Sequence, residues 1–548
     1  MPKITINGKE IEFKQGQTII QVASENGITI PHFCWHPSLS VSGNCRMCLV
    51  EVEKMPKLVI ACATLAADGM VVNIDSSKAV QARDAVMEFL LINHPLDCPV
   101  CDEAGECKLQ DYAYKYNKGE SRYDDEKTHK DKRVPLGPFV MFDAERCISC
   151  SRCIRFCDEI AGENQLTFVK RGNRVTINTF PGKSMDNAYS LNTTDICPVG
   201  ALTNRDFRFK ARVWDMSKTN SICTGCARGC NDEIWVRNNI ILRLTPRFNQ
   251  DVNSYWMCDA GRLNTFGHIN GNRIESVIIK ENGPSVMQDI SEALIPVADR
   301  LKSFKSSEIL FVASPFATLE DNYMLKKLAS GVFHSNKITY FDHITPGSGD
   351  DRLIRDDKAP NAEGLRLLGI SPVTDIDAFV RQIADGTIKA VYCLEDDIAG
   401  IDERIRRVLP ELQLLVTHAV NPNNTTELAA IVLPASSYAE KNGTMVNFQK
   451  RVQRIRPAVA TRHMDRSLDG MSMSRLDKFG TDFDKWARKN RKDAYPGWQM
   501  ISLIASHMGD KNKYDTSEDV FLEIAGTVKD FRGMDYDSIG ECGQVVKS

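Results

Sequence analysis

Apolar and polar positions alternate over short stretches in the first part of the chain. Residues 3–7 and 10–13 alternate on either side of Asn7-Gly8, a pair that favours a two-residue hairpin turn. The pattern then predicts a helix at Thr18–Asn26, a loop carrying cysteines, and a strand at Leu49–Val52. We therefore predict a small β-rich unit with one helix that ends near residue 78.

The next stretch changes from helical to charged. A helix is predicted from Lys78 to Asn93, and it leads into His94-Pro95. The run from Lys118 to Arg133 is charged and nearly free of large apolar residues, which is typical of a linker or exposed loop. Cysteine-rich modules are expected after it.

The pattern changes again after Asp259, where no further cysteine cluster occurs. Short apolar runs at 309–313, 390–394 and 414–417 are separated by amphipathic or polar segments of helical length. Continuous apolar strands that alternate with helices indicate buried parallel strands, so this part predicts an α/β layer fold.

The C-terminal stretch, roughly 80 residues, carries a run of positive charge that usually marks an exposed face. We predict that it is solvated and partly helical. The charged side chains that lie close together are Lys485, Arg488, Lys489, Arg491 and Lys492.

Composition and charge exclude several function classes. The chain has 548 residues, of which 42% are hydrophobic and 26% charged, and its net charge is −3. That balance gives no reason to expect nucleic acid or an anionic membrane surface as a partner. The start, MPKITINGKEIEF, lacks the pattern of a secretory signal, and no apolar run is long enough to span a bilayer. We expect a soluble or peripheral protein in a reducing compartment.

Cysteines carry the strongest signal. The chain has 18 of them, and 15, together with one histidine, form four quartets within the first 258 residues. Such clusters in an unsecreted chain indicate metal ligands rather than disulfides. Four ligand sets in tandem predict a carrier of electrons.

The first quartet is Cys34, Cys45, Cys48 and Cys62, spaced C-x10-C-x2-C-x13-C. Thiolates on the loops of a β-rich module suit a 2Fe–2S cluster. A four-cysteine zinc site is the alternative, but such sites use two CxxC pairs and this quartet has one.

The second quartet is His94, Cys98, Cys101 and Cys107, in HPLDCPVCDEAGEC. Three cysteines do not complete a 4Fe–4S site, and His94 is the nearest candidate for the fourth ligand. Imidazole in place of thiolate removes a negative charge and raises the reduction potential of the cluster. A histidine that only caps a helix end, and a zinc site of three cysteines and one histidine, remain the alternatives.

The third quartet joins Cys147, Cys150 and Cys153, spaced C-x2-C-x2-C, with the distant Cys197-Pro198. In bacterial ferredoxins the next cysteine, here Cys157, serves a second cluster. Cys197 is the one cysteine between Asp158 and Ile222, too few for a second cluster. We predict one 4Fe–4S cluster, with Cys157 unligated and packed nearby.

The fourth quartet is Cys223, Cys226, Cys230 and Cys258, spaced C-x2-C-x3-C-x27-C, another full 4Fe–4S set. Zinc is again the alternative, and the three preceding redox sites argue against it. The remaining Cys393 and Cys542 stand alone and are interpreted as structural or exposed thiols.

The order of these motifs resembles the large iron–sulfur subunit, known as the G subunit, of NADH:quinone oxidoreductase, which is respiratory complex I. The resemblance covers residues 1–262 through HPLDCPVCDEAGEC, RCISCSRCIRFCDE, CPVGAL and CTGCARGC…WMCDAGR. It continues more loosely to about residue 460, where NPNNTTELAAIVLPASSYAEKNGTMVNFQKRVQRIRPAV looks like the end of a molybdopterin-oxidoreductase domain.

The resemblance implies a multidomain α+β and α/β fold. Its expected parts are a β-grasp 2Fe–2S ferredoxin-type domain, a 4Fe–4S segment with one histidine and three cysteine ligands, a 4Fe–4S ferredoxin-like module, a 4Fe–4S molybdopterin-oxidoreductase N-terminal module, and a shortened, inactive molybdopterin-oxidoreductase-like α/β domain with a C-terminal extension. Their expected limits are, in order, 1–78, 79–117, 137–215, 216–270 and 271–548.

The resemblance also implies a function and partners. Electrons from NADH would enter at a flavin in a partner subunit and pass from cluster to cluster toward quinone. The chain would hold one 2Fe–2S and three 4Fe–4S clusters, of which the one at Cys223–Cys258 matches a cluster that only some members have and that lies off the main path. The chain would have no substrate site of its own and would contact the flavin- and NADH-binding subunit and other peripheral-arm subunits. It would lie on the cytoplasmic side of a bacterial inner membrane, bound to it only through the complex.

The sequence argues against molybdenum in the C-terminal domain. Active molybdenum enzymes of the related family carry CxKGR after their cluster, whereas this chain has Ala260 in the lysine's place. Cys393 is followed closely by Glu395, Asp396 and Asp397, whose charge opposes thiolate formation and anionic pterin phosphates. We expect neither molybdenum nor molybdopterin.

Three other functions remain to be weighed. The catalytic subunit of an NAD-linked molybdenum formate dehydrogenase would contain bound pterin. The electron-feeding subunit of an NAD-reducing hydrogenase would need further cysteines for a hydrogen-activating centre. A zinc-stapled scaffold would be colourless.

Overall fold

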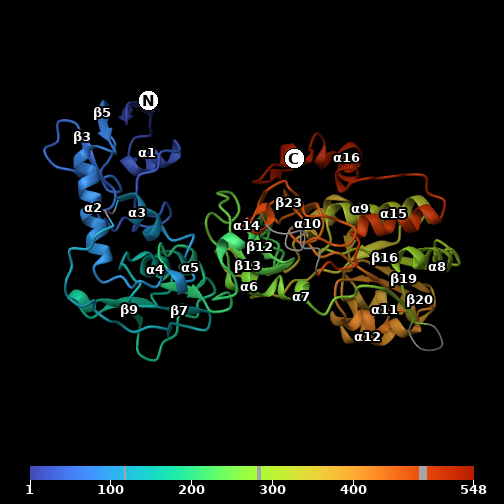
Figure 1. The fold of residues 1–548 in the computed structure, drawn as a ribbon. Coiled ribbons are helices and arrows are strands. Elements are labelled where there is room, and N and C mark those ends of the chain that lie inside the picture. Colours follow the sequence, from blue (N-terminus) through green and yellow to red (C-terminus); the bar gives the residue numbers. More distant parts are fainter. Residues whose placement is uncertain (117–118, 281–285, 480–489, 548) are drawn as a thin grey trace. The chain divides into compact units, whose positions relative to one another are not determined.

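Two compact units, Met1–Val213 and Trp214–Ser548, make up the chain (Figure 1). The structure is a computed structural model that describes residues 1–116, 119–280, 286–479 and 490–547. Among these residues, no helix is long and apolar enough to cross a membrane.

The first unit begins with a five-stranded sheet in the order β2-β1-β5-β3-β4. Strands β1 (Lys3–Ile6) and β2 (Lys9–Glu12) pair antiparallel across Asn7 and Gly8, which both have positive φ, so the predicted hairpin is confirmed. Strand β5 (Met70–Asn73) pairs parallel with β1 and antiparallel with β3 (Leu49–Val52), and β4 (Val59–Ile60) closes the sheet.

Helix α1 (Ile19–Glu25) packs on this sheet and confirms the predicted helix. Its apolar residues Ile19, Ile20 and Val22 share a core with side chains of β1, β3 and β5. A capping box between Thr18 and Gln21 fixes its first turn. The β-rich unit with one helix predicted for the start of the chain is therefore confirmed.

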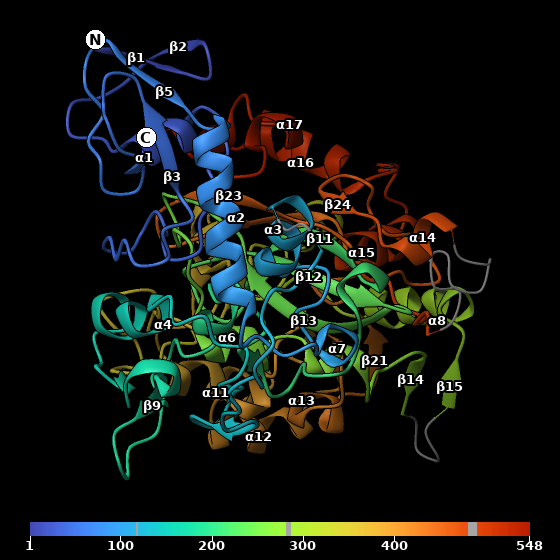
Figure 2. The same cartoon turned by 60° about the vertical axis from the view of Figure 1, so that its left-hand side comes forward.

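Helix α2 (Ser77–Leu91) carries the chain from this sheet to His94, and it contacts α3 (Lys108–Tyr116) (Figure 2). Arg83 on α2 is fully buried. Its guanidinium donates to the carbonyl of Leu49 at 3.0 Å, pairs with Asp75 at 3.3 Å, and lies over the ring of Tyr116. One side chain thus ties the sheet, α2 and α3 together.

The rest of the first unit consists of short elements. Residues 119–133 contain no helix or strand, as predicted for the charged run, whose first residue lies outside the described part. Two small sheets follow: one has the order β10 (Leu202–Asn204), β7 (Val140–Phe142), β6 (Val134–Pro135), and the other pairs β8 (Leu166–Val169) with β9 (Thr176–Thr179). The helical elements are short: α4 (Arg152–Arg155), a π-helical turn (Phe156–Ile160) and α5 (Asn192–Asp195).

The second unit opens with a four-stranded antiparallel sheet, β13-β12-β11-β24. Strands β11 (Ser217–Ile222), β12 (Asn231–Arg237) and β13 (Ile240–Pro246) follow one another, and β24 (Met471–Ser472) pairs with β11 from far along the chain. Asn238 and Asn239 both have positive φ, which a two-residue turn between β12 and β13 requires. Two short helices, α6 (Asp259–Asn264) and α7 (Gly267–Asn270), come next.

An eight-stranded sheet, β15-β14-β21-β20-β19-β16-β17-β18, forms the body of this unit. The strands from β16 to β21 run parallel, which confirms the predicted α/β layer fold, and three of them contain the predicted apolar runs. The bounds are β14 (Val277–Ile279), β15 (Val286–Gln288), β16 (Ile309–Val312), β17 (Ile338–Tyr340), β18 (Ser371–Pro372), β19 (Ala390–Cys393), β20 (Leu414–Ala419) and β21 (Ile431–Pro434).

Helices cover both faces of this sheet (Figure 1). One face packs against α8 (Ile290–Lys302), α9 (Leu319–Lys327), α15 (Gly497–His507) and α16 (Ser517–Thr527). The other packs against α11 (Ile376–Ala384) and α12 (Glu403–Val408). Shorter elements complete the unit: α10 (Ala362–Leu367), α13 (Asn424–Leu428), β22 (Gly443–Val446), β23 (Arg451–Ile455), α14 (Arg475–Phe479), α17 (Tyr536–Ile539) and β25 (Gln544–Val545).

The prediction of a solvated C-terminal stretch was wrong in its main point. The helices are present, but Trp498, Ile501 and Phe521 of α15 and α16 are buried in the main core. The polar residues that alternate along these helices obscured a face that the sheet covers. Of the predicted charge run, Lys485, Arg488 and Lys489 lie outside the described residues, and Arg491 and Lys492 are half-buried.

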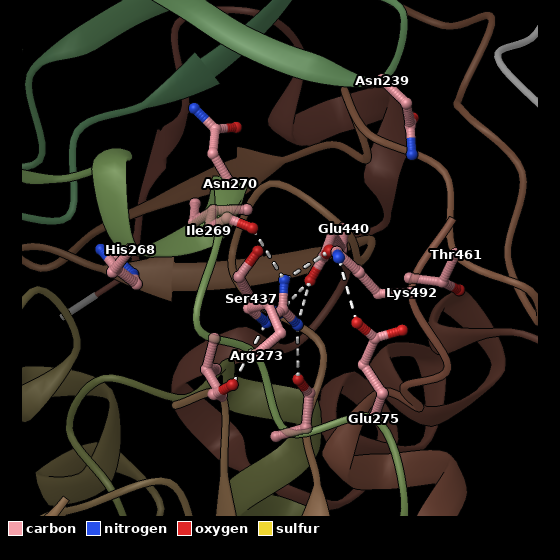
Figure 3. Close-up of polar contacts among 12 residues, drawn as sticks. Asn239, His268, Ile269, Asn270, Arg273, Glu275, Ser437, Glu440, Thr461 and Lys492 are labelled. Atoms are coloured by element: carbon pink, nitrogen blue, oxygen red, sulfur yellow. Dashed lines mark hydrogen bonds and ion pairs between the residues drawn. The ribbon is translucent and has the colours of Figure 1, made fainter. Parts of the chain in front are cut away.

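A buried ion pair holds the carboxyl ends of two sheet strands (Figure 3). Arg273 and Glu440 have side chains with no exposed surface, and two guanidinium–carboxylate contacts of 2.7 and 2.8 Å join them. Arg273 also donates to the carbonyls of Val420 after β20 and Ala435 after β21. The pair therefore fixes the loops on which the cavity described below depends.

Replacing Glu440 by Gln should destabilise the second unit by about 3–5 kcal/mol, because Arg273 would remain buried without its countercharge. Urea unfolding followed by tryptophan fluorescence measures this. The control is Glu403→Gln, which breaks the exposed pair with Arg407 and should change stability by less than about 0.5 kcal/mol. Equal effects of the two changes would contradict the role given to the buried pair.

Candidate metal centres

The structure brings the first predicted quartet together as two pairs of thiols. Cys34 and Cys45 share a hydrogen bond, and Cys48 and Cys62 share another. The first bond lowers the pKa of Cys34 and raises that of Cys45, since one sulfur keeps the proton. The backbone N–H of Cys34 also points to the Cys45 sulfur at 3.5 Å. Cys34, Cys48 and Cys62 are buried.

The cysteines of the second quartet lie on either side of a short 3-10 turn. The turn, Cys98–Val100, places Cys101 close behind Cys98, and Cys107 directly precedes α3. Cys98 is exposed, Cys101 is buried, and burial raises the pKa of Cys107 to about 12. In addition to burial, the charge of Cys98 raises the pKa of Cys101, and the charge of Cys101 raises the pKa of Cys107. The three thiols are therefore neighbours.

His94 faces a cavity that is also lined by a cysteine of the third quartet. Burial, and then the charges of Arg146 and Lys127, lower its pKa to about 4, so the imidazole is neutral near pH 7, as a metal ligand must be. The side chain of Arg146, which affects both His94 and Cys101, is held by Asp97 at 2.9 Å. His94 lines a cavity of about 200 Å³ together with Cys147.

The third quartet surrounds one cavity. Cys147, Cys150, Cys153 and Cys197 all line it, with apolar walls from Phe142, Ile177, Val199 and Leu202. Burial raises the pKa of Cys153 and Cys197 well above the usual range of a thiol. Ser149 and Ser151, on either side of Cys150, have positive φ, which folds this loop around the sulfurs.

Cys157 does not line this cavity. It is fully buried in the π-helical turn that follows α4, and burial raises its pKa to about 12. That Cys157 is an unligated thiol packed near the site stays a prediction.

The fourth quartet lies in the second unit, between β11 and α6. Cys223 follows β11, Cys230 precedes β12, and the N–H of Cys223 donates to the carbonyl of Cys230 at 2.8 Å. Cys258 is the N-cap of α6, and its sulfur accepts from the N–H of Gly261 at 3.3 Å. All four cysteines, Cys226 included, line one cavity.

Glycines leave room for the sulfurs at two of these sites. A Cβ atom at Gly261 would lie 2.9 Å from the Cys223 sulfur and 3.3 Å from that of Cys258. A Cβ atom at Gly200 would lie 2.3 Å from the Cys101 sulfur. Since real Cβ atoms do not come this close, both positions need glycine. The spaces fit a cluster bound between the sulfurs.

Within the described ranges, no group of three or more His, Cys, Asp or Glu side chains is placed to hold a single metal ion.

Two arginines link the first and third sites. The guanidinium of Arg152 donates to the carbonyls of Trp35, next to Cys34, and Ile196, next to Cys197. Arg155 donates to the carbonyl of Cys34 at 2.6 Å. Burial opposes the charge of Arg152, and the nearby cysteines, Cys150 first among them, favour it.

The segment after Cys197 links the third site to the second. The N–H of Lys108 donates to the carbonyl of Pro198 at 3.2 Å, and the Cys107 sulfur lies 4.0 Å from the same oxygen. Two residues on, Gly200 faces the Cys101 sulfur. The third site therefore lies between the other two sites of the first unit.

The cavity at the fourth site has a volume of about 600 Å³ and reaches the carboxyl edge of the large sheet. Phe316 follows β16, Glu395 follows β19 and Ser437 follows β21, and all three line it. Strand β16 lies between β17 and β19. The chain continues from β16 to β17 and β18 on one side, and then adds β19 on the other side, so the strand order reverses at β16. Ligands of α/β sheets bind at such a switch point, beside the carboxyl ends of the strands.

Models of known protein families match five segments of the chain. They are a 2Fe-2S iron-sulfur cluster binding domain at 2–77, the NADH-ubiquinone oxidoreductase-G iron-sulfur binding region at 83–122, the ferredoxin-like domain of NADH-quinone oxidoreductase subunit 3 at 137–203, the NDSU1/NuoG-like 4Fe-4S domain of NADH-ubiquinone oxidoreductase at 216–265, and molybdopterin oxidoreductase at 364–468.

Relatives of the chain carry names from the same complex. The NADH-quinone oxidoreductase G subunit of Rickettsia conorii is 41% identical over 345 residues, which are 63% of this chain and 51% of the relative. The same protein of Rickettsia felis is 42% identical over 64% of this chain and 52% of its own length. The NADH-ubiquinone oxidoreductase 75 kDa subunit of Reclinomonas americana is 40% identical over 63% of this chain and 50% of its own.

The chain is homologous to the G subunit of NADH-quinone oxidoreductase. It spans about half the length of these curated relatives. A solved structure, of an NAD+-reducing NiFe hydrogenase in the H2-reduced state, is 29% identical over 39% of this chain and 91% of its own, with a TM-score of 0.35. The multidomain fold predicted from the motif order, with ferredoxin-type domains and a molybdopterin-oxidoreductase domain, is confirmed.

The cavity wall does not suit a molybdopterin dinucleotide, although the family model for that domain matches residues 364–468. Such a cofactor carries phosphates, and Glu395 puts a carboxyl group in the wall. The lining lysine, Lys358, donates its ammonium to the carbonyl of Arg355 at 2.7 Å. The absence of molybdenum stays a prediction.

Sequence reasoning missed the residues that support the ligands. Arg152, Gly200 and Gly261 hold or leave space for the cysteines, yet none of them is a ligand. Each lies within three residues of a predicted ligand, which was the available signal. Which of many nearby arginines and glycines do this depends on contacts between segments far apart in the chain.

Replacing Gly261 by Ala should lower the iron content by about four atoms per chain, because the new methyl group would press on two sulfurs of the fourth site. Iron analysis and electron paramagnetic resonance (EPR) of the reduced protein measure the loss. Gly267→Ala is the matched control, since nothing lies within 4 Å of a Cβ atom there. Full iron content in Gly261→Ala would show that these sulfurs do not hold a cluster.

Proposed function

We propose that this chain is an electron-transfer subunit of an NADH:quinone oxidoreductase, carrying electrons from the flavin of a partner subunit toward quinone. Its homology to the G subunit supports the proposal, and the observation that carries it is the chain of three neighbouring cysteine sites in the first unit. Partners would be the flavin- and NADH-binding subunit and other peripheral-arm subunits. The chain would lie on the cytoplasmic side of a bacterial inner membrane.

The four quartets would hold one 2Fe–2S and three 4Fe–4S clusters, which supply one-electron carriers when bound. The pairing of thiols at the first site suggests that Cys34 and Cys45 bind one iron and Cys48 and Cys62 the other. The second site would use His94, Cys98, Cys101 and Cys107. The third would use Cys147, Cys150, Cys153 and Cys197, and the fourth Cys223, Cys226, Cys230 and Cys258.

The protein's own contribution is to keep the sites close and dry. Arg152 and Arg155 hold the loop of Cys34 against the loop of Cys150. The segment Cys197–Gly200 holds the third site against Cys101 and Cys107. These contacts support the order first, third, second within the first unit. The exposed Cys98 would then mark the end at which electrons leave this unit.

Backbone N–H groups would tune the clusters. Ser149 donates toward the sulfur of Cys147 at 3.4 Å, and Gly225 toward that of Cys223 at 3.4 Å. Hydrogen bonds to thiolate sulfur stabilise the added negative charge of a reduced cluster, so they raise its potential.

Metal analysis of anaerobically purified chain tests the proposal. We expect about 14 irons per chain, from one 2Fe–2S and three 4Fe–4S clusters, with no molybdenum or zinc. NADH should reduce the clusters only when the flavin-bearing partner is present, because this chain is proposed to have no NADH site. Stoichiometric zinc would exclude the electron carrier, and stoichiometric molybdenum would favour a formate dehydrogenase.

Changing His94 to Cys should lower the reduction potential of one 4Fe–4S cluster by on the order of 100 mV, because a thiolate adds a negative charge that imidazole lacks. Redox titration followed by EPR measures the shift. His129→Cys is the control, because His129 is an exposed side chain in the same unit that pairs with Glu145. A potential that stays the same at full iron content would mean that His94 is not a ligand.

A further inference from the structure

The cavity at the fourth site is larger than its four cysteines need. Its volume of about 600 Å³ falls in the range of about 300–1,000 Å³ that small-molecule sites occupy. Loops after five parallel strands contribute to its wall, so the cavity extends from the cysteines to the switch point of the sheet. Phe316, Leu353, Ile354 and Val420 give the wall a largely apolar surface.

The charged side chains in the wall are already hydrogen-bonded within the protein. Both oxygens of Glu395 accept from the ammonium of Lys441 at 2.9 Å, and Lys441 also bonds Asp321 at 2.7 Å. The ammonium of Lys358 donates to carbonyls of its own loop. Burial, and then the charge of Arg273, lower the pKa of His268, which favours its neutral form. The charged lining groups therefore already have partners within the protein.

Two hydroxyl groups in the wall are buried. Ser437 and Tyr438 line the cavity and are 3% and 6% exposed. The Ser437 hydroxyl has no hydrogen-bond partner in the structure, and the neighbour of the Tyr438 hydroxyl is the hydroxyl of Thr265. The neighbouring Thr265 hydroxyl gives its proton to the carbonyl of Gly261 at 2.7 Å. A buried hydroxyl without a partner is destabilising, so such groups normally find one. Both residues follow β21, on the loop that the buried ion pair holds in place.

We propose that this cavity binds an uncharged small molecule that has an apolar ring and one carbonyl or hydroxyl group, hydrogen-bonded by Ser437 and Tyr438. The apolar side chains would enclose the ring. An anion would meet the carboxyl group of Glu395 at low dielectric, and a cation would find that carboxyl group already paired. This inference concerns the second unit alone and does not rest on the proposed electron transfer.

Fluorine NMR of the full chain tests the site with two matched probes. One is para-fluoroacetophenone, an uncharged aromatic ketone that does not react with thiols. The other is para-fluorobenzoate, which has the same ring and a carboxylate in place of the ketone. We expect saturable broadening of the ketone signal and none of the benzoate signal. Saturable binding of benzoate with equal affinity, or no saturable binding of the ketone, would overturn the proposal.

Variants then locate the binding. Ser437→Ala and Tyr438→Phe should each weaken the affinity for the ketone about twofold to tenfold, the usual effect of one lost hydrogen bond. Ser436→Ala is the control, because Ser436 is equally buried and also unpartnered but does not line the cavity. Val420→Phe should weaken binding, because the larger side chain narrows the apolar wall. Circular dichroism confirms that each variant folds.

Two results would contradict this location. An affinity for the ketone that is unchanged by Val420→Phe in a folded protein would place the probe elsewhere. Equal losses in Ser436→Ala and Ser437→Ala would mean that the effect comes from packing and not from a hydrogen bond to the ligand. Iron content, measured on the same samples, reports separately on the clusters, so failure of either proposal is distinguishable.

Discussion

Burial of cysteine sulfur is the constraint on which this protein depends. A buried thiol is stable when protonated, and burial raises the pKa of Cys153, Cys197, Cys223 and Cys230 far above that of a free thiol. The thiolate form that metals require is then reached only when a cation replaces the protons. Binding of the metal is therefore coupled to the folding of the loops that carry the sulfurs.

That coupling explains the form of the first unit. Its third site rests on loops, short turns and two small sheets. Polar side chains connect these loops to the rest of the unit. Arg83 ties α2 to the first sheet, and Arg152 ties the loops of the first and third sites. Each of these guanidinium groups connects separate segments through several donors, which a lysine ammonium does less rigidly.

The second unit works differently, because a large parallel sheet with helices on both faces gives it a core of its own. The fourth site lies at the edge of that core and takes part of its wall from the sheet's carboxyl end. Arg273 and Glu440 fix this edge from within. The result is a rigid body whose cavity opens between the cysteines and the switch point, a place suited to a small ligand even without a pterin cofactor.

Local patterns in the sequence determined the elements whose partners lie close along the chain. The hairpin at Asn7-Gly8, α1, β3 and the parallel strands β16, β19 and β20 all follow from alternation, turn residues and apolar runs. The cysteine spacings likewise indicated four metal sites, because ligand residues must lie on short loops. The buried faces of α15 and α16 were missed, since their burial depends on a sheet whose strands come much earlier in the chain.

The tertiary structure alone decided how the sites relate to one another. No spacing in the sequence indicates that Arg152 bonds the carbonyls of both Trp35 and Ile196. Nor does any spacing indicate that Gly200, which follows a cysteine of the third site, lies against the sulfur of Cys101 in the second site. The same holds for Ser437 and Tyr438, which no sequence pattern marks. They follow β21 and line the same cavity as Cys223. The choice of candidate ligands follows from local sequence order, whereas distance, burial and shared walls depend on which segments the folded core brings together.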